Sequence, residues 1–302
     1  MKILIGPSTF GDVDPSPLRR LAAAGCEVVP NPYRRKLTSS ELLELLPGVT
    51  GLIAGLEPLT RDVLERSNLQ VISRSGAGVS NVDCDAAREL GIKVFTTPDA
   101  PTSAVAELTV GVMLALLRRV PQMDRDLHEG KWSKQIGLQL EGKNVVIVGF
   151  GRIGRCVAAL LRAFGANLFA VDPQLSGDVD GVRVLPIDEA LRRADIITLH
   201  ASGEHEILGA REFDLLKRGV FILNAGRGGL VNEALLCRAL DEGKVAGGWI
   251  DTFETEPYEG PLTRYAQLIL TPHVGSASAE CRLRMENEAV DNLLRGLGVE
   301  RR

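Results

Sequence analysis

The chain has 302 residues, too long for one ordinary hydrophobic core, and its length predicts two domains. It is 45% hydrophobic and 25% charged, with a formal net charge of -4, which is the composition of a globular protein. This charge gives no reason to bind nucleic acid or an anionic membrane. No apolar run approaches the roughly 20 residues that span a bilayer. The segment MKILIGPSTFGDVD resembles a first strand rather than a signal peptide, so cytoplasmic residence is expected.

In the first hundred residues, short apolar runs alternate with helical patterns. Strands are expected at residues 2–5, 27–29, 51–55, 70–73 and 92–95. Helices are expected at residues 16–24, 41–46, 60–66 and 83–90, and a Thr38–Glu41 capping box opens the second of them. This alternation predicts a parallel sheet that is covered on both faces, and hence a domain of its own.

Two prolines, Pro98 and Pro101, then interrupt the pattern. A long and mostly apolar helix is expected at residues 103–119, and its burial on several sides suits a connector packed between two domains. Residues 120–140 are expected to be polar and irregular, with Trp132 as an anchor.

The second half of the chain resumes the alternation. Strands are expected at residues 145–148, 168–171, 196–199, 220–223, 247–250 and 268–270. Helices are expected at residues 187–193, 210–216, 232–242 and 278–294, the last of which would return to the first domain. Polar residues follow several strand ends, and the carboxyl edge of an open α/β sheet is where ligands bind. The fold class is therefore α/β, with two Rossmann-like or flavodoxin-like parallel-sheet domains.

The five cysteines are scattered and form no C-x-x-C pair: Cys26, Cys84, Cys156, Cys237 and Cys281. This pattern suits reduced thiols rather than a disulfide framework, and no metal site is expected. We interpret Cys84 as a buried thiol, because no activating partner stands beside it.

The stretch after the strand at 145–148 fits G-x-G-x-x-G, with Gly149, Gly151 and Gly154. The first glycine permits a tight turn, the second lets backbone amides approach a pyrophosphate, and the third lets the following helix pack against the strand. Asp172 ends the next strand, where a carboxylate binds the ribose hydroxyls of an adenosine. A carboxylate would also repel a 2′-phosphate, so the cofactor predicted is NAD rather than NADP.

Three further groups stand out: Arg227, Glu256 and His273. Hydride transfer between a nicotinamide and a 2-hydroxy acid requires a clamp for the carboxylate and a group that moves the hydroxyl proton. Arg227, in a glycine-rich turn, suits the clamp. His273, just after a strand, suits the proton carrier, and Glu256 could orient the imidazole and raise its pKa. Taken singly, such residues are more often surface or satisfied polar groups.

Three blocks, NAGRGGLV (224–231), DTFETEP (251–257) and TPHVGS (271–276), resemble signature segments of the D-isomer-specific 2-hydroxyacid dehydrogenases. With the glycine motif and Asp172, the resemblance covers essentially the whole chain. It implies Arg227 as the substrate-binding arginine, His273 as the acid/base and Glu256 as its partner. It also implies a discontinuous substrate domain, residues 1–98 plus 276–302, around an NAD-binding domain, residues 99–275.

The same resemblance implies further cofactor contacts. The amides of Arg152 and Ile153 would meet the pyrophosphate, and Asp251 would hold the nicotinamide carboxamide. His200 and Ala225, which follow strand ends, are also expected at the cofactor. A homodimer is expected from the family alone.

Within the family the chain most resembles the phosphoglycerate dehydrogenase branch, through its segments 73–83, 106–109 and 130–132. Arg74, Ser75, Gly76, Ala77 and Gly78 would form a substrate loop, whose small residues bring amides to the substrate carboxylate. Arg74 is a candidate for binding a second anionic group such as a phosphate, and an ordinary surface arginine is an equal alternative. The substrate expected is a small anionic hydroxy or keto acid.

Several positions depart from that branch. Ser80 stands where an acid is usual. The segment after His200, with Glu204, is shorter than in the family and lacks a proline, so the adenine side is expected to differ. The chain stops at Arg302, and a C-terminal regulatory domain is therefore not expected.

Other functions remain open from the sequence. A hydroxypyruvate/glyoxylate-type reductase, or a dehydrogenase of a specialised pathway, would use the same residues. Corepressors that resemble this fold use NAD chiefly to control assembly, and fold alone does not exclude such a binding role. The complete set of Arg227, Glu256 and His273 favours an enzyme. The sequence determines neither the acid nor the physiological direction.

Overall fold

The computed structural model describes residues 1–203 and 205–299, so Glu204, in the shortened segment after His200, lies outside the described residues. The chain forms two compact units. Unit 1 contains Met1–Pro101 together with Ala277–Arg302, and unit 2 contains Thr102–Ser276. Each unit has its own parallel sheet, and the predicted α/β fold class is confirmed.

Unit 1 has a five-stranded sheet in the order β2-β1-β3-β4-β5, and all of its strand pairs are parallel. This is the flavodoxin-like order of a doubly wound sheet. Its strands are β1 (Lys2–Ile5), β2 (Glu27–Val29), β3 (Val49–Ala54), β4 (Val71–Arg74) and β5 (Lys93–Thr96). Its helices are α1 (Ser16–Ala23), α2 (Ser39–Leu45), α3 (Arg61–Glu65), α4 (Cys84–Glu89) and α11 (Ala279–Gly296).

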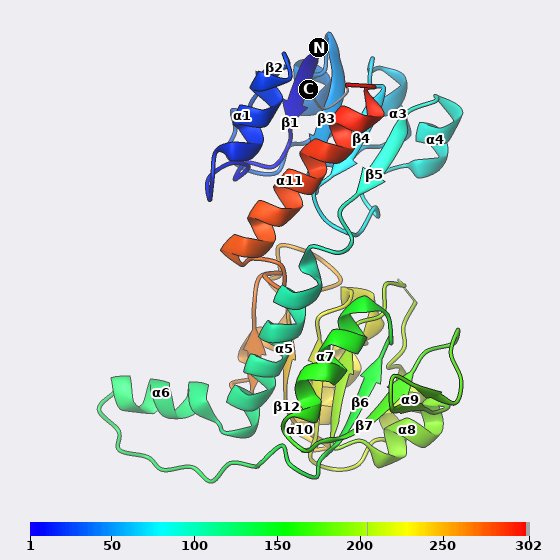
Figure 1. Ribbon diagram of the computed structural model, residues 1–302. Helices are drawn as coiled ribbons and strands as arrows, with labels where there is room; N and C mark the ends of the chain where they lie inside the picture. Colours follow the sequence, from blue (N-terminus) through cyan, green and yellow to red (C-terminus); the bar gives the residue numbers. More distant parts are fainter. Residues whose placement is uncertain (204, 300–302) are drawn as a thin grey trace. The chain divides into compact units, whose positions relative to one another are not determined.

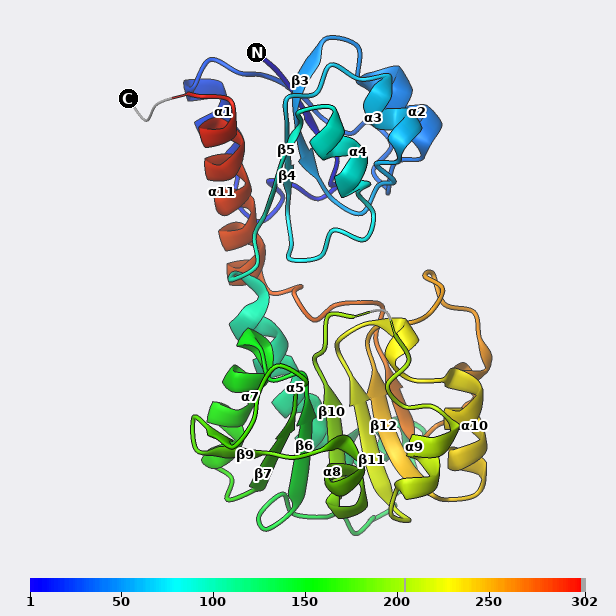
Figure 2. The same ribbon diagram turned by 90° about the vertical axis from the view of Figure 1, so that its right-hand side faces the viewer.

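The alternation of side chains along β1 shows how this sheet is covered. Leu4 packs with residues of α2, α3 and α4 on one face, whereas Ile3 and Ile5 pack with α1 and α11 on the other. Figures 1 and 2 show α11 along that second face. Each such fully buried side chain stabilises the fold by about 1.5–3 kcal/mol. The expected return of the last helix to the first sheet is therefore observed.

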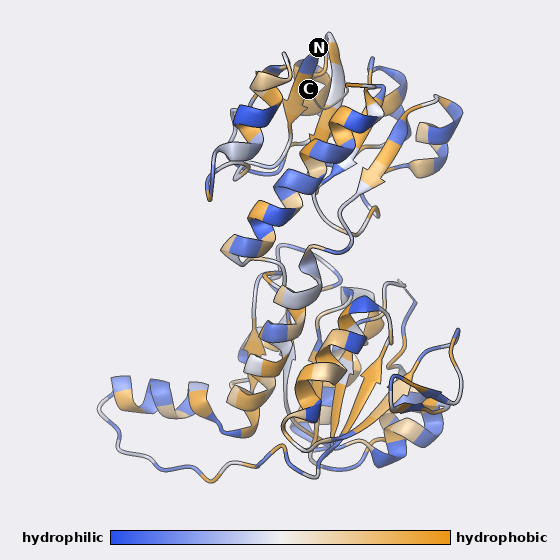
Figure 3. Cartoon of the chain, in the orientation of Figure 1, coloured by the Kyte–Doolittle hydropathy of each residue, from blue (hydrophilic) through white to orange (hydrophobic). Residues whose placement is uncertain are grey.

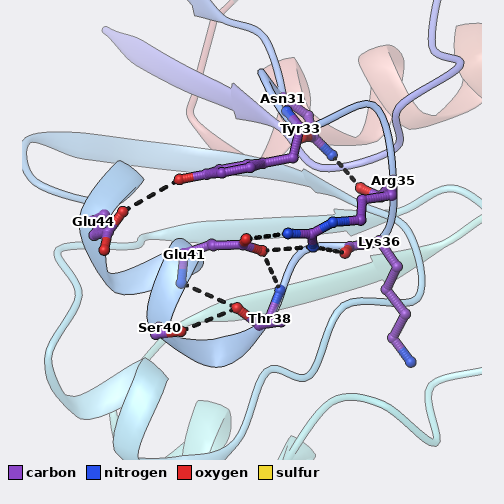
Figure 4. Close-up of polar contacts among 8 residues, drawn as sticks. All are labelled: Asn31, Tyr33, Arg35, Lys36, Thr38, Ser40, Glu41 and Glu44. Atoms are coloured by element: carbon purple, nitrogen blue, oxygen red, sulfur yellow. Dashed lines mark hydrogen bonds and ion pairs between the residues drawn. The ribbon is translucent and has the colours of Figure 1, made fainter.

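The expected capping box at α2 is confirmed. Glu41 N donates to Thr38 Oγ1 (3.4 Å), and Thr38 N donates to Glu41 Oε2 (2.9 Å), as Figure 4 shows. Arg35 binds the same carboxylate and holds its pKa down at about 2, with the hydrogen bond from Thr38 N acting in the same direction. The residues before α2 are thereby fixed to its first turn.

Unit 2 has an eight-stranded sheet in the order β13-β12-β11-β10-β6-β7-β9-β8, parallel except at β8–β9. Around β6 this is the Rossmann order. Its strands are β6 (Asn144–Val148), β7 (Asn167–Val171), β8 (Asp178–Val179), β9 (Val182–Val184), β10 (Ile196–Leu199), β11 (Val220–Asn224), β12 (Val245–Ile250) and β13 (Leu268–Leu270). Its helices are α5 (Pro101–Leu117), α6 (Val120–His128), α7 (Arg152–Arg162), α8 (Ile187–Arg193), α9 (Ala210–Leu215) and α10 (Glu233–Asp241), with 3-10 turns η1 (Gly228–Leu230) and η2 (Pro261–Arg264).

Both faces of the unit 2 sheet are covered as well. Val146 and Val148 pack with α8, α9 and α10, and Val145 and Ile147 pack with α5 and α7. In Figure 3 the strands of this sheet are predominantly orange, as expected for strands buried on two sides. No helix in the described ranges has the length and apolar character needed to cross a bilayer.

Two expectations for residues 120–140 are wrong. Val120–His128 forms α6. Pro121 does not prevent this helix, because it lies in the first turn, where a backbone N–H would have no hydrogen-bond acceptor within the helix. Trp132 is not an anchor, since 81% of it is exposed, and Ile136 nearby is 93% exposed. In Figure 1 α6 and the chain that follows it project from the end of α5. We call residues 120–139 the arm.

Candidate active site

The glycine turn after β6 has the shape needed for close backbone approach. Gly149 has a φ of +86° and lies so close to Ala201 that a Cβ would be 2.5 Å from its amide nitrogen. A Cβ on Gly154 would lie 2.3 Å from the Gly149 carbonyl oxygen, so only glycine lets α7 start this near to β6. Gly151, the N-cap of α7, has open space around it. Its openness and the following amides of Arg152 and Ile153 fit a bound pyrophosphate.

Asp172 follows β7 and comes back to this turn. Its Oδ2 accepts a hydrogen bond from Phe150 N (2.9 Å) and its Oδ1 accepts one from Gln174 N (2.9 Å). The half-buried carboxylate is thus fixed in orientation and keeps lone pairs for other donors. The structure brings the predicted acid and the predicted glycines together, as a ribose contact requires.

A carboxylate–imidazole pair forms at the same edge of the sheet. His273 Nδ1 lies 2.9 Å from Glu256 Oε2, and Phe253 N donates to Glu256 Oε1 (3.1 Å). The second interaction fixes the carboxylate, and the carboxylate in turn fixes the ring. With Nδ1 held, the Nε2 atom of His273 is the one available for proton transfer.

Asp251 holds the backbone beside His273. Its Oδ1 accepts from Val274 N (2.9 Å) and from the Thr271 hydroxyl, and its Oδ2 accepts from Gly275 N (2.8 Å). Trp249 Nε1 donates to Thr271 Oγ1 (2.7 Å) and completes the chain of bonds. The positioning contribution of Thr271 was not predicted. Its signal in the sequence was only a hydroxyl directly after a buried strand.

Arg227 lies in the turn after β11, but its contacts are local. Its Nη1 donates to Gly226 O (2.8 Å), and Asn224 Nδ2 donates to Arg227 O (2.9 Å). Gly228 packs so tightly on the following loop that a Cβ would be 1.9 Å from the carbonyl carbon of Phe253. The turn carrying Arg227 is therefore fastened to the loop that carries Glu256. No described hydrogen bond joins Arg227 to Glu256 or His273.

His200 and Ala225 end neighbouring strands. Desolvation lowers the pKa of the half-buried His200 to about 4, so its ring is neutral near pH 7. His200 Nε2 lies 2.9 Å from Thr198 Oγ1. Its Nδ1 is buried and has no hydrogen-bond partner among the residues that the structure describes. Ala225 N donates to Leu199 O (3.2 Å).

The predicted substrate loop belongs to unit 1. Ser75 N donates to Ala54 O (2.8 Å), and Gly76 N donates to Thr97 Oγ1 (2.7 Å). These two amides are therefore engaged in the fold, and the amides of Ala77 and Gly78 become the candidates for a substrate carboxylate. Arg74 folds back over the loop, since its Nη1 donates to Ser75 O and occupies the space of a Cβ on Gly76.

Among the described residues, no group of three or more His, Cys, Asp or Glu side chains is placed to hold a metal ion. Burial raises the pKa of four cysteine thiols: Cys26, Cys156, Cys237 and Cys281. These thiols are less reactive as a result.

The family model for the D-isomer specific 2-hydroxyacid dehydrogenase NAD-binding domain matches residues 110–275. The chain belongs to the D-isomer specific 2-hydroxyacid dehydrogenase family. Unit 2, which contains the matched residues, is its NAD-binding domain. The glycine turn and Asp172, which fit a dinucleotide, lie in this domain.

Individual relatives agree with this assignment. The chain is 40% identical over 259 residues to D-3-phosphoglycerate dehydrogenase of Methanocaldococcus jannaschii, which covers 82% of this chain and 49% of the relative. It is 35% identical to hydroxypyruvate reductase of Thermotoga maritima, over 87% of this chain and 90% of the relative. The chain thus spans about half the length of the phosphoglycerate dehydrogenases it matches.

A solved structure confirms the fold over the whole chain. The TT0316 protein from Thermus thermophilus superposes with a TM-score of 0.90 at 34% identity, over 99% of this chain and 97% of that one. The predicted family and the predicted fold are therefore both confirmed.

Proposed function

We propose that the protein is an NAD-dependent oxidoreductase that interconverts a small D-2-hydroxy acid and its 2-keto acid. The observation that carries the proposal is the His273–Glu256 pair, 2.9 Å apart, at the sheet edge that also bears the glycine turn. The bound nicotinamide would accept or supply the hydride. Gly149, Gly151, Gly154 and Asp172 would hold that cofactor.

The residues of the chain have separable tasks in this reaction. His273 Nε2 would take the hydroxyl proton during oxidation and return one to the carbonyl oxygen during reduction. Glu256 would stabilise the protonated ring and keep it oriented, as its bond to Nδ1 supports. Arg227 would bind the substrate carboxylate by two parallel hydrogen bonds once its guanidinium leaves Gly226 O. In unit 1, the amides of Ala77 and Gly78 stay candidate donors to a carboxylate.

The relatives support two substrates. One is 3-phosphoglycerate, whose phosphate Arg74 would bind, and the other is hydroxypyruvate or glyoxylate. The hydrogen-bonded His273–Glu256 pair favours an enzyme over a corepressor-like role, because binding of NAD alone needs no oriented imidazole.

The test is a substrate panel with purified protein and NADH, using hydroxypyruvate, phosphohydroxypyruvate, glyoxylate and pyruvate. We expect NADH to be oxidised with at least one keto acid. His273→Asn should lower kcat by about 10²–10⁴-fold, because general acid–base catalysis is lost, and should leave NADH affinity unchanged.

The matched control is His128→Asn, because His128 is exposed on α6 and makes no contact with the pair. It should retain full turnover. Absence of turnover with every acid in the wild type, or a His273→Asn variant as active as the wild type, would contradict the proposed function.

We also propose that the protein is a homodimer that uses the arm. Trp132 and Ile136 are large, apolar and almost fully exposed, which is unusual for a free surface. The arm is nevertheless fixed to unit 2, since Gln122 Nε2 donates to Ala266 O (3.1 Å) and Leu138 N donates to Leu117 O (2.8 Å). The arm is thus an apolar projection that its own unit holds in place, and such a surface fits an interface with a second copy of the chain.

A further inference from the structure

The loop that carries Glu256 is closed at its ends by two stacked aromatic rings. The ring centroids of Phe253 and Tyr258 lie 4.2 Å apart, and the angle between the ring planes is 20°. Residues 254–257, between the two rings, are exposed, so their own burial does little to fix the loop. Stacked aromatic side chains attract each other beyond the apolar area that they bury. The stack therefore joins the two ends of the loop.

Phe253 connects this stack to the carboxylate–imidazole pair. It is 9% exposed and belongs to the core of unit 2, and a Cβ on Gly228 would lie 2.0 Å from Phe253 O. Phe253 N donates to Glu256 Oε1 (3.1 Å), and Glu256 Oε2 lies 2.9 Å from His273 Nδ1. A displacement of Phe253 therefore moves the carboxylate that holds the imidazole.

The hydroxyl of Tyr258 anchors the other ring. It accepts a hydrogen bond from Leu262 N (3.2 Å), and Leu262 is fully buried. Desolvation raises the pKa of Tyr258 to about 12, and a hydrogen bond with Glu233 of α10 acts in the same direction. The phenol therefore keeps its proton near pH 7 and can donate it to Glu233. Glu233 Oε1 also accepts from Glu254 N (3.4 Å), so α10 holds both the ring and the loop.

We propose that Tyr258 is a positioning residue for the proposed reaction. Its ring holds Phe253 where the backbone N–H of that residue directs Glu256 onto the imidazole. The inference rests on the proposed function, in which this carboxylate orients the ring and stabilises its protonated form. Such stabilisation depends on geometry, since a displacement of about 1 Å can cost about 10²-fold in rate.

Steady-state kinetics of the full chain test this role, with NADH and the keto acid that the wild type reduces fastest. Tyr258→Ala should lower kcat about tenfold, because the carboxylate is no longer held in one place, and should change the NADH dissociation constant by less than about twofold. Tyr258→Phe keeps the stacked ring and should retain at least about half of the wild-type kcat. A loss in Tyr258→Phe equal to that in Tyr258→Ala would overturn the role of the stack.

A double-mutant cycle separates positioning from a general loss of structure. Glu256→Ala removes the carboxylate that Tyr258 positions, so adding Tyr258→Ala to it should change kcat by less than about twofold. An equal loss in both backgrounds would mean that Tyr258 does not act through Glu256, and would overturn the inference.

Tyr265→Ala is the matched control. Tyr265 also packs against the core that contains Phe253, desolvation also raises its pKa to about 12, and its hydroxyl also bonds to an acid, Asp241 (3.1 Å). Its ring stands outside the Phe253–Tyr258 stack. The kcat of Tyr265→Ala should equal that of the wild type, and a loss as large as in Tyr258→Ala would overturn a role specific to the stack.

The outcomes also separate the two proposals. Wild-type protein that reduces no keto acid overturns the proposed function and the inference that rests on it. Turnover in the wild type, with kcat unchanged in Tyr258→Ala, overturns the inference alone. If Tyr258→Ala does not fold, Phe253→Leu removes the other ring of the stack, keeps an apolar side chain in the core, and should show the same loss of kcat.

Discussion

At the scale of single residues, Asp251 is the buried carboxylate that fixes the backbone directly after His273. It accepts hydrogen bonds from Val274 N and Gly275 N, the two amides that follow His273. His273 has a φ of 54°, a left-handed conformation that such bonds can maintain. A contact from Asp251 to a nicotinamide carboxamide remains a prediction.

His200 carries a prediction on pH. Its folded pKa of about 4 lies below its ordinary value of 6.5, so the unfolded chain binds the proton more readily. Stability is therefore constant above about pH 6.5 and falls as the pH drops towards 4, by on the order of 3 kcal/mol at most.

Urea denaturation of wild type and His200→Asn at pH 7.5, 5.5 and 4.5 measures this contribution, and other titrating groups cancel in the difference. The wild type should lose more stability than the variant over this interval. Parallel pH profiles would refute the assignment of a neutral ring.

Asp172 and His273 could be selected because each closely follows a strand end, where the sheet topology gathers side chains. Glu256 was selected from its place in a loop before a proline and from the family resemblance. Thr271 was not selected. Its positioning contribution comes from two neighbours distant in sequence, Trp249 and Asp251, and a local pattern contains neither.

At the scale of elements, the glycines between β6 and α7 have different roles. Gly154 touches the Gly149 carbonyl, whereas Gly151 has open space and a φ of -79°, which any residue can adopt. One glycine thus serves the packing of the helix on the strand, and the other serves the approach of a ligand.

We expect Gly151→Ala to change stability by less than about 0.5 kcal/mol and to weaken NADH binding at least about tenfold, because the methyl group enters the pyrophosphate's space. Gly154→Ala should destabilise unit 2 by about 1–3 kcal/mol through overpacking. Thermal denaturation and NADH fluorescence titration distinguish the two. Equal loss of stability in both variants would be inconsistent with this division.

The helix α6 was missed for a physical reason. Pro121 was interpreted as part of an irregular segment, yet a proline in the first turn of a helix loses no hydrogen bond. The apolar residues of the arm also gave a misleading signal, because Trp132 suggested an anchor and is instead 81% exposed. A sequence pattern cannot say whether an apolar side chain is covered by its own fold or by a partner.

At the scale of the molecule, the sheet order of each unit follows the βα alternation, which is why the fold class was predictable. The small strands β8 and β9 were not predicted, since two or three residues are too few for a periodicity. The homodimer was expected from the family resemblance alone, and it stays a prediction. The arm now gives it a surface that experiment can address.

The exposed apolar residues of the arm predict that the protein is a dimer. Wild-type protein should elute as a dimer in light-scattering chromatography, and Trp132→Ser with Ile136→Ser should shift it to monomer, because the exposed apolar area is removed. Phe164→Ser, which alters another exposed aromatic of unit 2, should leave the dimer intact. A monomeric wild type, or a dimer that survives both substitutions, would count against the arm.

The return of α11 to unit 1 also has a consequence for the order in which the protein is made. The face of β3 and β4 that contains Ile53 and Val71 is covered by Ala289, Val290 and Leu293. All of Thr102–Ser276 is synthesised between these two sets of residues. At ordinary translation rates of roughly 5–20 residues per second, roughly 11–44 s separate the emergence of that apolar face from that of its cover. Synthesis of unit 1 therefore starts before that of unit 2 and ends after it.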